Sequence, residues 1–194
     1  MRHWGVKAGD KVGVVGLGGL GHMAVKLARA LGAEVTVFTT SPDKQADAEA
    51  LGATHVTVEK EVTSKAEELA ATPGSFDLIL STVPEKHDIN AFVALLKRDK
   101  SLVIVGALEP MAPVNNQAVA FHRRSVSGSL IGSIKETQEV IDFCAEHNIA
   151  PEIEVIPIQA INRAMNKVEK GDVGFRYVID MASLKGEEAD DSAD

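Results

Sequence analysis

The first 150 residues alternate between short continuous apolar runs and segments in which apolar residues recur every three or four positions. Runs of the first kind predict buried parallel strands, and segments of the second kind predict helices with one apolar face. The predicted strands are residues 11–15, 34–38, 54–58, 76–83, 101–105 and 125–131. Strands that alternate with helices build a parallel sheet covered on both faces, so the pattern predicts a doubly wound α/β domain with six strands.

Capping residues mark the ends of the predicted helices. A helix over residues 20–31 ends at Gly32, which suits the left-handed conformation of a helix stop. The other helices begin after side chains that can accept hydrogen bonds from backbone N–H groups. These starts are Ser41 with Pro42 for a helix to about Leu51, Ser64 with Glu67, Asp88 for a helix that carries Ile89, Phe92, Val93 and Leu96, and Ser133 with Glu136 for a helix that carries Ile134, Val140, Ile141 and Cys144.

The rhythm of the chain changes after Pro151. A strand near residues 153–156, a helix that carries Ile161 and Val168, and a strand over residues 175–180 look like a piece of another domain. Five of the last ten residues are acidic, which is typical of a disordered, solvated tail. We therefore expect three parts, residues 1–150, 151–184 and 185–194.

Charge, hydropathy and cysteine content narrow the function classes. The 194-residue chain has 28 acidic and 20 basic residues, a formal net charge of −8, which argues against the basic face that nucleic-acid binding requires. No apolar run approaches the roughly 20 residues of a membrane span, and the first residues lack a secretory leader's apolar stretch. We expect a cytoplasmic protein. The single cysteine, Cys144, excludes an internal disulfide, and its place on an apolar helix face predicts buried packing.

A glycine motif, Gly16-Leu17-Gly18-Gly19-Leu20-Gly21, follows the first predicted strand and opens a helix. In such a turn the first glycine permits the tight bend, Gly18 lets the backbone approach a pyrophosphate, and Gly21 lets the helix pack closely on the strand. Helix-terminal N–H groups and the positive end of the helix dipole then face the anion. Glycines also mark ordinary turns, so the motif alone leaves a plain turn open. The next residue, His22, suits a surface or packing position better than a catalytic one.

The end of the second strand discriminates between nucleotides. NAD-binding domains place an acidic residue there to bind the ribose hydroxyls, and methyltransferases commonly use a similar acid. This chain has no carboxylate after the strand until Asp43. The residues Thr39, Thr40, Ser41 and Lys44 can instead donate hydrogen bonds and positive charge to a 2′-phosphate, which favours NADP over NAD and makes a methyltransferase the weaker alternative. The hydroxyls can also simply cap a helix while Lys44 stays solvated beside Asp43, and this reading stays open.

The later strands end at further candidate residues. These are Thr82, Gly106 and the run Ser129-Leu130-Ile131. Ligands in open α/β sheets bind outside the carboxyl ends of the strands, so a cofactor on the glycine motif would continue along these positions. Each residue taken alone also fits a turn or a core position, and only the shared edge makes them candidates.

Longer stretches around these motifs resemble a known family. Residues 16–28, the turn Phe38-Thr39-Thr40-Ser41, the segment 129–139 and the ending 170–180 together are similar to the cinnamyl-alcohol-dehydrogenase branch of the zinc-dependent medium-chain dehydrogenases. The resemblance covers about residues 4–183 and implies a six-stranded Rossmann sheet that binds NADP. It also implies that Gly16 to Gly21 hold the pyrophosphate, that Thr39, Thr40, Ser41 and Lys44 surround the 2′-phosphate, and that Thr82, Gly106 and Ser129 to Ile131 line the ribose and nicotinamide.

The same resemblance implies an oxidoreductase that interconverts primary alcohols and aldehydes by hydride transfer. Members of this family begin with a catalytic domain that carries the zinc ligands, and the present sequence starts after the corresponding region, so no catalytic or metal residue can be carried over. Residues 151–184 would then be a remnant of the catalytic domain, zinc would belong to the full-length enzyme, and the isolated chain would be inactive. Uncovered apolar surface would favour homo-oligomers. A standalone module that binds or senses a dinucleotide without catalysis is the alternative.

Overall fold

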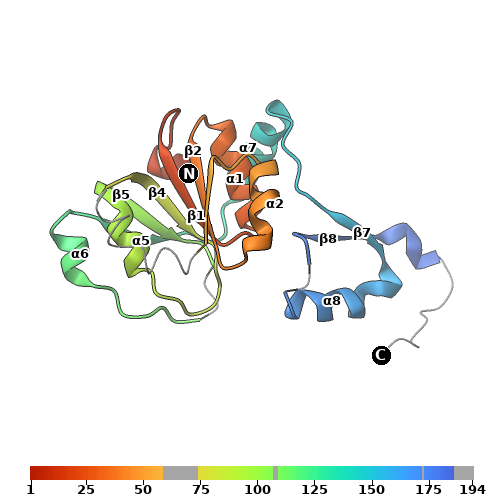
Figure 1. Ribbon diagram of the computed structural model, residues 1–194. Helices are drawn as coiled ribbons and strands as arrows, with labels where there is room; N and C mark the ends of the chain where they lie inside the picture. Colours follow the sequence, from red (N-terminus) through yellow and green to blue (C-terminus); the bar gives the residue numbers. More distant parts are fainter. Residues whose placement is uncertain (59–73, 107–108, 172, 186–194) are drawn as a thin grey trace. The chain divides into compact units, whose positions relative to one another are not determined.

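The computed structural model describes residues 1–58, 74–106, 109–171 and 173–185 (Figure 1). The chain divides into two units, Met1–Ile149 and Ala150–Asp194. The helix predicted from Ser64 with Glu67 lies outside the described residues. The glycine motif, residues 16–21, lies in the first unit.

A six-stranded parallel sheet forms the centre of the first unit and confirms the predicted α/β fold. Its strands are β1 (Lys11–Val15), β2 (Glu34–Thr39), β3 (His55–Val58), β4 (Phe76–Ser81), β5 (Leu96–Ile104) and β6 (Ser125–Gly128). They lie side by side in the order β3-β2-β1-β4-β5-β6, and Figure 1 shows the first strand β1 in red within the sheet and β4 and β5 in yellow-green. The chain therefore winds outward in both directions from β1 and β4, and the boundary between these two strands is the switch point where ligands bind in such sheets.

Helices connect these strands. They are α1 (Gly21–Ala30), α2 (Gln45–Ala50) after the 3₁₀ turn η2 (Pro42–Lys44), α5 (Asn90–Leu95), α6 (Asn116–Ala120) and α7 (Ile134–Glu146), with η1 (Arg2–Trp4) at the start. Because crossovers between parallel strands are right-handed, a reversal of strand order sends the connections to opposite faces of the sheet. Helix α1 packs on β1 and β2, while α5 packs on β5 and α6. Gly32 follows α1 at φ 82°, as the predicted helix stop requires.

An aromatic cluster fills the core beside the switch point. The ring of Phe38 packs edge-to-face against Phe76 and Phe92, with ring centroids 5.7 and 5.2 Å apart. Ile79 and Leu102 from the central strands are fully buried in the same cluster. Gly13 on β1 lies against Phe38 and Ile79, where a Cβ would come within 3.0 and 3.1 Å of their side chains. Burial of this kind, at about 25 cal/mol per Å² of apolar surface, is the main source of the unit's stability.

Several element boundaries differ from the prediction. Strand β5 begins at Leu96, a residue predicted to lie on the preceding helix, because the polar run 97–100 extends the strand at its exposed amino-terminal end. The pairing with β4 shifts register between Phe76 and Leu78, and Asp99 has φ 64°, so this part of the strand is irregular. Strands β4 and β6 end at Ser81 and Gly128, earlier than predicted. Polar runs at a sheet end do not show the continuous apolar signal of a buried strand.

The predicted caps are only partly realised. Ser133 and Glu136 form the capping box of α7, with Glu136 Oε2 accepting from the Ser133 N–H at 2.7 Å. This backbone hydrogen bond lowers the pKa of Glu136. Ser41 precedes η2 but its side chain makes no capping hydrogen bond, and the helix with Asp88 starts at Asn90, whose N–H donates to Asp88.

The apolar face of α7 corrects one prediction. Cys144 is half-buried rather than buried, and α7 has no buried residue. Val140 and Ile141 on the same helix are exposed. The periodicity correctly predicted the apolar stripe, but nothing in the described part of the chain covers it fully.

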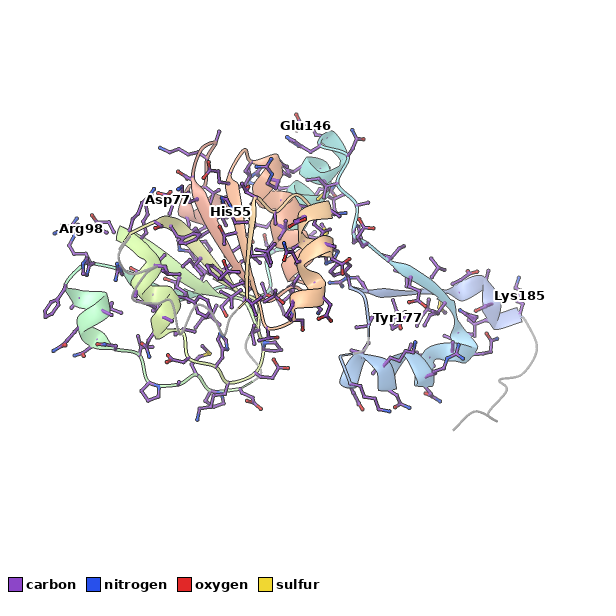
Figure 2. All side chains as sticks on the ribbon, viewed as in Figure 1. His55, Asp77, Arg98, Glu146, Tyr177 and Lys185 are labelled. Atoms are coloured by element: carbon purple, nitrogen blue, oxygen red, sulfur yellow. The ribbon has the colours of Figure 1, made fainter. Side chains whose placement is uncertain are left out.

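A charged cluster at the amino-terminal end of the sheet surrounds Asp77 on β4, which is labelled in Figure 2. Its carboxylate accepts from Lys97 Nζ at 2.6 Å and from the Lys11 N–H at 3.0 Å, and Lys100 Nζ lies 3.3 Å away. Burial raises the pKa of Asp77, but these hydrogen bonds and the nearby lysine charges outweigh burial and leave the pKa below its ordinary value of 3.8. The folded state therefore prefers the charged carboxylate more strongly than the unfolded state does.

Acid should consequently weaken the fold through Asp77. A carboxyl group whose pKa is depressed by folding stabilises above its unfolded pKa, and this stabilisation is lost as the pH falls from about 4 through the lower folded pKa. We expect Asp77→Asn to lower the free energy of unfolding at pH 7 by about 1–2 kcal/mol, because the amide keeps the shape of the side chain but loses the charge-assisted hydrogen bonds. Urea unfolding of both proteins at pH 7 and pH 3 measures this. If the difference in free energy of unfolding between the two proteins is as large at pH 3 as at pH 7, the charged form of Asp77 is not the source of this stabilisation.

The second unit contains a parallel strand pair joined by a helix. Strand β7 (Glu154–Pro157) leads through η3 (Ile158–Ala160) into α8 (Ile161–Glu169), and β8 (Tyr177–Asp180) pairs beside β7 before η4 (Met181–Lys185). Among its described residues only Ile156 and Ala164 are buried. The apolar residues that stay exposed are Ile153, Val155, Ile161, Met165, Val168, Val178, Met181 and Leu184. A unit with so little buried surface lacks a core of its own.

Candidate functional site

Backbone hydrogen bonds bring the predicted strand-end residues to one edge of the sheet. Beyond the strands proper, the N–H of Gly16 donates to Phe38 O and that of Thr82 to Val15 O, both at 2.9 Å. In the same way Gly106 donates to Ser81 O at 3.2 Å and Ser129 to Ile104 O at 3.0 Å. The ends of five neighbouring strands are therefore joined laterally, and the glycine motif lies at the switch point among them.

Three of the four glycines of the motif, Gly16, Gly18 and Gly21, occupy different environments. Gly16 has φ 88°, and a Cβ there would lie 2.9 Å from both the Thr82 hydroxyl and Val83 Cγ2. A Cβ on Gly21 would lie 2.1 Å from the carbonyl oxygen of Gly16, so only glycine allows α1 to approach the strand end this closely. A Cβ on Gly18 would meet nothing within 4 Å, so at this position the backbone faces open space. These environments match the turn, the close packing and the ligand approach that the motif predicts.

The carbonyl groups of the glycine loop are held by protein donors. Thr82 Oγ1 lies 2.9 Å from Val15 O and 3.2 Å from Gly16 O, and Lys44 Nζ donates to Leu17 O at 3.3 Å. Gly18 O accepts from the His22 N–H at 3.0 Å. Carbonyl oxygens would repel an anion, and here each of the four is engaged by a donor. The loop therefore offers an anion the positive end of α1.

His22 is fully buried at the first turn of α1, so the packing position is the one observed. Its Nδ1 lies 3.3 Å from Gly18 O. Because a carbonyl oxygen can only accept, Nδ1 carries a hydrogen in this contact. His22 thus supports the glycine loop from the buried side and does not face a ligand.

The candidate 2′-phosphate residues follow β2 in the turn Thr39–Lys44. Thr39 is buried and its Oγ1 accepts from the Ser41 N–H at 3.2 Å, so this hydroxyl shapes the turn. Thr40 is exposed, while Ser41 and Lys44 are half-buried. The hydrogen bond from Lys44 to Leu17 brings the ammonium group to the glycine loop. The turn after β2 therefore combines the Lys44 ammonium group, which reaches the glycine loop, with the accessible hydroxyls of Thr40 and Ser41.

The family comparison bears directly on this arrangement. The model of the family described as zinc-binding dehydrogenase matches residues 19–146. This chain belongs to the zinc-binding dehydrogenase family. Among curated relatives, it is 48% identical over 187 residues to the aldehyde reductase YahK of Escherichia coli, covering 95% of this chain and 52% of the relative. It is also 48% identical over 185 residues to the NADP-dependent alcohol dehydrogenase C 1 of Mycolicibacterium smegmatis, with the same shares covered.

Solved structures agree with this assignment. The cinnamyl alcohol dehydrogenase SbCAD4 of Sorghum bicolor matches with a TM-score of 0.86 and 39% identity over 96% of this chain and 52% of that one. The CAD of Helicobacter pylori, solved as a complex with NADP(H), matches with a TM-score of 0.81 and 38% identity over 93% and 50%. The chain thus spans about half the length of these zinc-binding dehydrogenases.

The run after β6 lies at the same edge of the sheet as the glycine loop but is far more exposed. Ser129 continues the sheet through its bond to Ile104 O, while Leu130 and Ile131 expose 77% and 92% of their surface. Ile131 therefore packs against almost nothing in the described chain. Their predicted part in lining the nicotinamide stays a prediction.

Sequence reasoning predicted Thr82 at the site but missed its neighbour Val83, which forms a wall of the site together with it. A Cβ on Gly106 would lie 2.6 Å from Thr82 O and 2.7 Å from Val83 O, so this segment is wedged between Gly106 and Gly16. Val83 extends the apolar run of β4 and therefore looks like a core residue in the sequence. The available signal in the sequence was the glycine after each of the two flanking strands, Gly16 after β1 and Gly106 after β5, which leaves room for a segment packed between them.

Within the described ranges of the chain, no three His, Cys, Asp or Glu side chains gather into a set that could hold a metal. The helices described there also include none with the length and apolar character needed to cross a membrane. The open glycine loop at the switch point of the sheet supports nucleotide binding at this edge.

Proposed function

We propose that this chain is the NADP-binding portion of a zinc-dependent alcohol dehydrogenase that interconverts primary alcohols and aldehydes by hydride transfer. The glycine loop carries this proposal: it lies at the switch point, it is open at Gly18, and its carbonyls are held by donors. Relatives named as NADP-dependent alcohol dehydrogenase and aldehyde reductase support the reaction class. Calorimetry tests the binding, with NADPH expected to bind and S-adenosylmethionine expected not to.

The residues present fit a dinucleotide. The pyrophosphate would lie on Gly16 to Gly21, where the backbone is open at Gly18, and the cofactor would continue along Thr82, Gly106 and Ser129 to Ile131. When bound, NADP(H) supplies or accepts the hydride at its nicotinamide ring. The chain's own part is to bind the pyrophosphate on the α1 N-terminus and to hold the wall Thr82-Val83 beside it.

The described residues do not fit a zinc site, since they contain no set of candidate ligands. The reaction therefore also requires zinc ligands that the described residues do not supply. We propose that residues 151–184 belong to the catalytic domain, because the described part of this unit buries only Ile156 and Ala164. Such exposed apolar surface favours self-association of the isolated chain. Sedimentation as a monomer at high concentration would count against that association.

Preference for NADP over NAD is the next part of the proposal, and Lys44 is its test. We expect Lys44→Glu to weaken NADPH at least tenfold more than NADH, because a carboxylate beside the accessible Thr40 and Ser41 hydroxyls repels a 2′-phosphate. Part of the loss should be shared by both cofactors, since the variant also removes the hydrogen bond to Leu17 O. Titration of NADPH and NADH into both proteins measures the difference.

A matched control is available at Lys7, which is an exposed lysine before β1, away from the carboxyl ends of the strands. Lys7→Glu makes the same charge change and should leave the NADPH to NADH ratio close to that of the unmodified chain. Equal losses of NADPH and NADH in Lys44→Glu would remove the 2′-phosphate role and leave Lys44 as a support of the loop alone.

A further inference from the structure

Thr82 and Val83, together with the next residue Pro84, form the wall Thr82–Pro84, which contacts its surroundings through both side-chain and backbone atoms. Gly16 and Gly106 contact it from the two flanking strand ends, as the close approach of their Cβ positions shows. The carbonyl of Pro84 also accepts from the Glu109 N–H at 3.1 Å. The wall thus lies directly against the glycine loop, and a shift of its backbone would change the shape of the proposed cofactor site.

The imidazole of His87 bridges the two ends of this segment through hydrogen bonds. Its Nε2 lies 2.9 Å from Ser81 Oγ, and its Nδ1 lies 2.8 Å from Glu85 O. The carbonyl can only accept, so Nδ1 carries a hydrogen, and in the neutral imidazole Nε2 then accepts the hydroxyl hydrogen of Ser81. Ser81 is the last residue of β4 and is fully buried. One half-buried imidazole therefore joins the rigid end of β4 to the backbone just beyond the wall.

We propose that His87 is a positioning residue for the dinucleotide, which holds the wall Thr82–Pro84 against the glycine loop. This inference rests on the proposed function. Without the imidazole, the buried Ser81 hydroxyl loses its partner and the backbone after Thr82 loses its tie to β4. His87 acts through the wall and does not itself bind the cofactor. The part of NADP(H) beyond the adenosine should depend on it, because the turn after β2 belongs to a different strand end.

The test compares two ligands on the full chain. NADPH contacts the loop and the wall, whereas adenosine 2′-phosphate lacks the pyrophosphate and nicotinamide halves. We expect His87→Leu to raise the dissociation constant of NADPH roughly fivefold to tenfold, the effect of about one hydrogen bond. The dissociation constant of adenosine 2′-phosphate should stay the same. His87→Gln should recover most of the NADPH affinity, because its amide can reach the Ser81 hydroxyl. His122→Leu, at an exposed histidine, is the matched control.

The outcomes separate this inference from the proposed function. If the unmodified chain does not bind NADPH, the proposed function fails and the role of His87 fails with it. If that chain binds NADPH and His87→Leu binds it equally well, only the role of His87 is overturned. Equal losses for both ligands, or no recovery in His87→Gln, would show a general structural role and also overturn it.

The single variant Ser81→Ala covers the case in which His87→Leu does not fold. Ser81→Ala removes the other partner of the same bond and should weaken NADPH while leaving adenosine 2′-phosphate unchanged. If both single variants fold, their effects on NADPH should be non-additive, because each removes the same interaction. Additive losses, or a Ser81→Ala variant with unchanged NADPH affinity, would contradict the proposed contact.

Discussion

Gly21→Ala is expected to abolish measurable NADPH binding and to lower the free energy of unfolding by about 2–3 kcal/mol, the usual cost of overpacking. The added Cβ would lie 2.1 Å from Gly16 O and 3.0 Å from Gly16 C. Both are backbone atoms, so no side-chain rotation can relieve the clash. Helix α1 must move away from the end of β1, and this movement opens the loop that would hold the pyrophosphate. Calorimetry with NADPH and urea unfolding measure the two effects.

Gly18→Ala is the matched control, since it adds the same methyl group to the same loop. Its Cβ would meet nothing within 4 Å and the backbone of Gly18 does not have a positive φ, so the stability should change by less than about 1 kcal/mol, the range of a glycine-to-alanine change that the backbone accepts. NADPH binding should nevertheless fall strongly, because the methyl group would occupy the space through which a pyrophosphate approaches the backbone. A Gly18→Ala protein that binds NADPH normally would contradict the loop as the pyrophosphate site. A Gly21→Ala protein of normal stability would contradict the close packing.

The glycine positions show how far the sequence alone reaches. Spacing after a β-branched run predicted a turn at Gly16, an open position at Gly18 and close packing at Gly21, and the structure has all three. The parallel sheet followed from the alternation of apolar runs and helical spacing. These features are local in sequence, so pattern and spacing suffice to predict them.

Contacts between distant segments could not be predicted in the same way. The bond of Lys44 to Leu17 O joins residues 27 apart, and Thr82 reaches Val15 O over 67 positions. Sequence reasoning predicted both residues at the site, but as groups facing a ligand, whereas the structure shows that each also holds a loop carbonyl. The imidazole of His87 escaped notice because a histidine in a polar turn carries no periodic signal.

Arg124 is a further residue that the pattern did not reveal, and it leads to the second large prediction. The residue is only 6% exposed, and its guanidinium lies among backbone carbonyls. Arg124 Nε donates to Leu96 O at 2.8 Å, Nη2 to Ala94 O at 3.0 Å, and Nη1 to Ala118 O at 3.3 Å. Burial lowers the pKa of Arg124. These carbonyls belong to the end of α5, the start of β5 and α6, so one side chain joins three elements just before β6.

We expect Arg124→Met to lower the free energy of unfolding by about 3 kcal/mol, because three carbonyls at a buried site lose their charged donor at once. Arg124→Lys should be intermediate, since an ammonium group cannot reproduce the planar fork that serves three acceptors. The neighbouring Arg123→Met is the matched control: Arg123 pairs with Asp99 on the exposed surface, and its loss should change stability little. Urea unfolding at low and high salt measures all three variants. The Arg124 effect should persist at high salt, because its partners are buried carbonyls and not surface charges. If Arg124→Met and Arg123→Met have the same free energy of unfolding, the contacts of the Arg124 guanidinium with α5, β5 and α6 do not stabilise the fold.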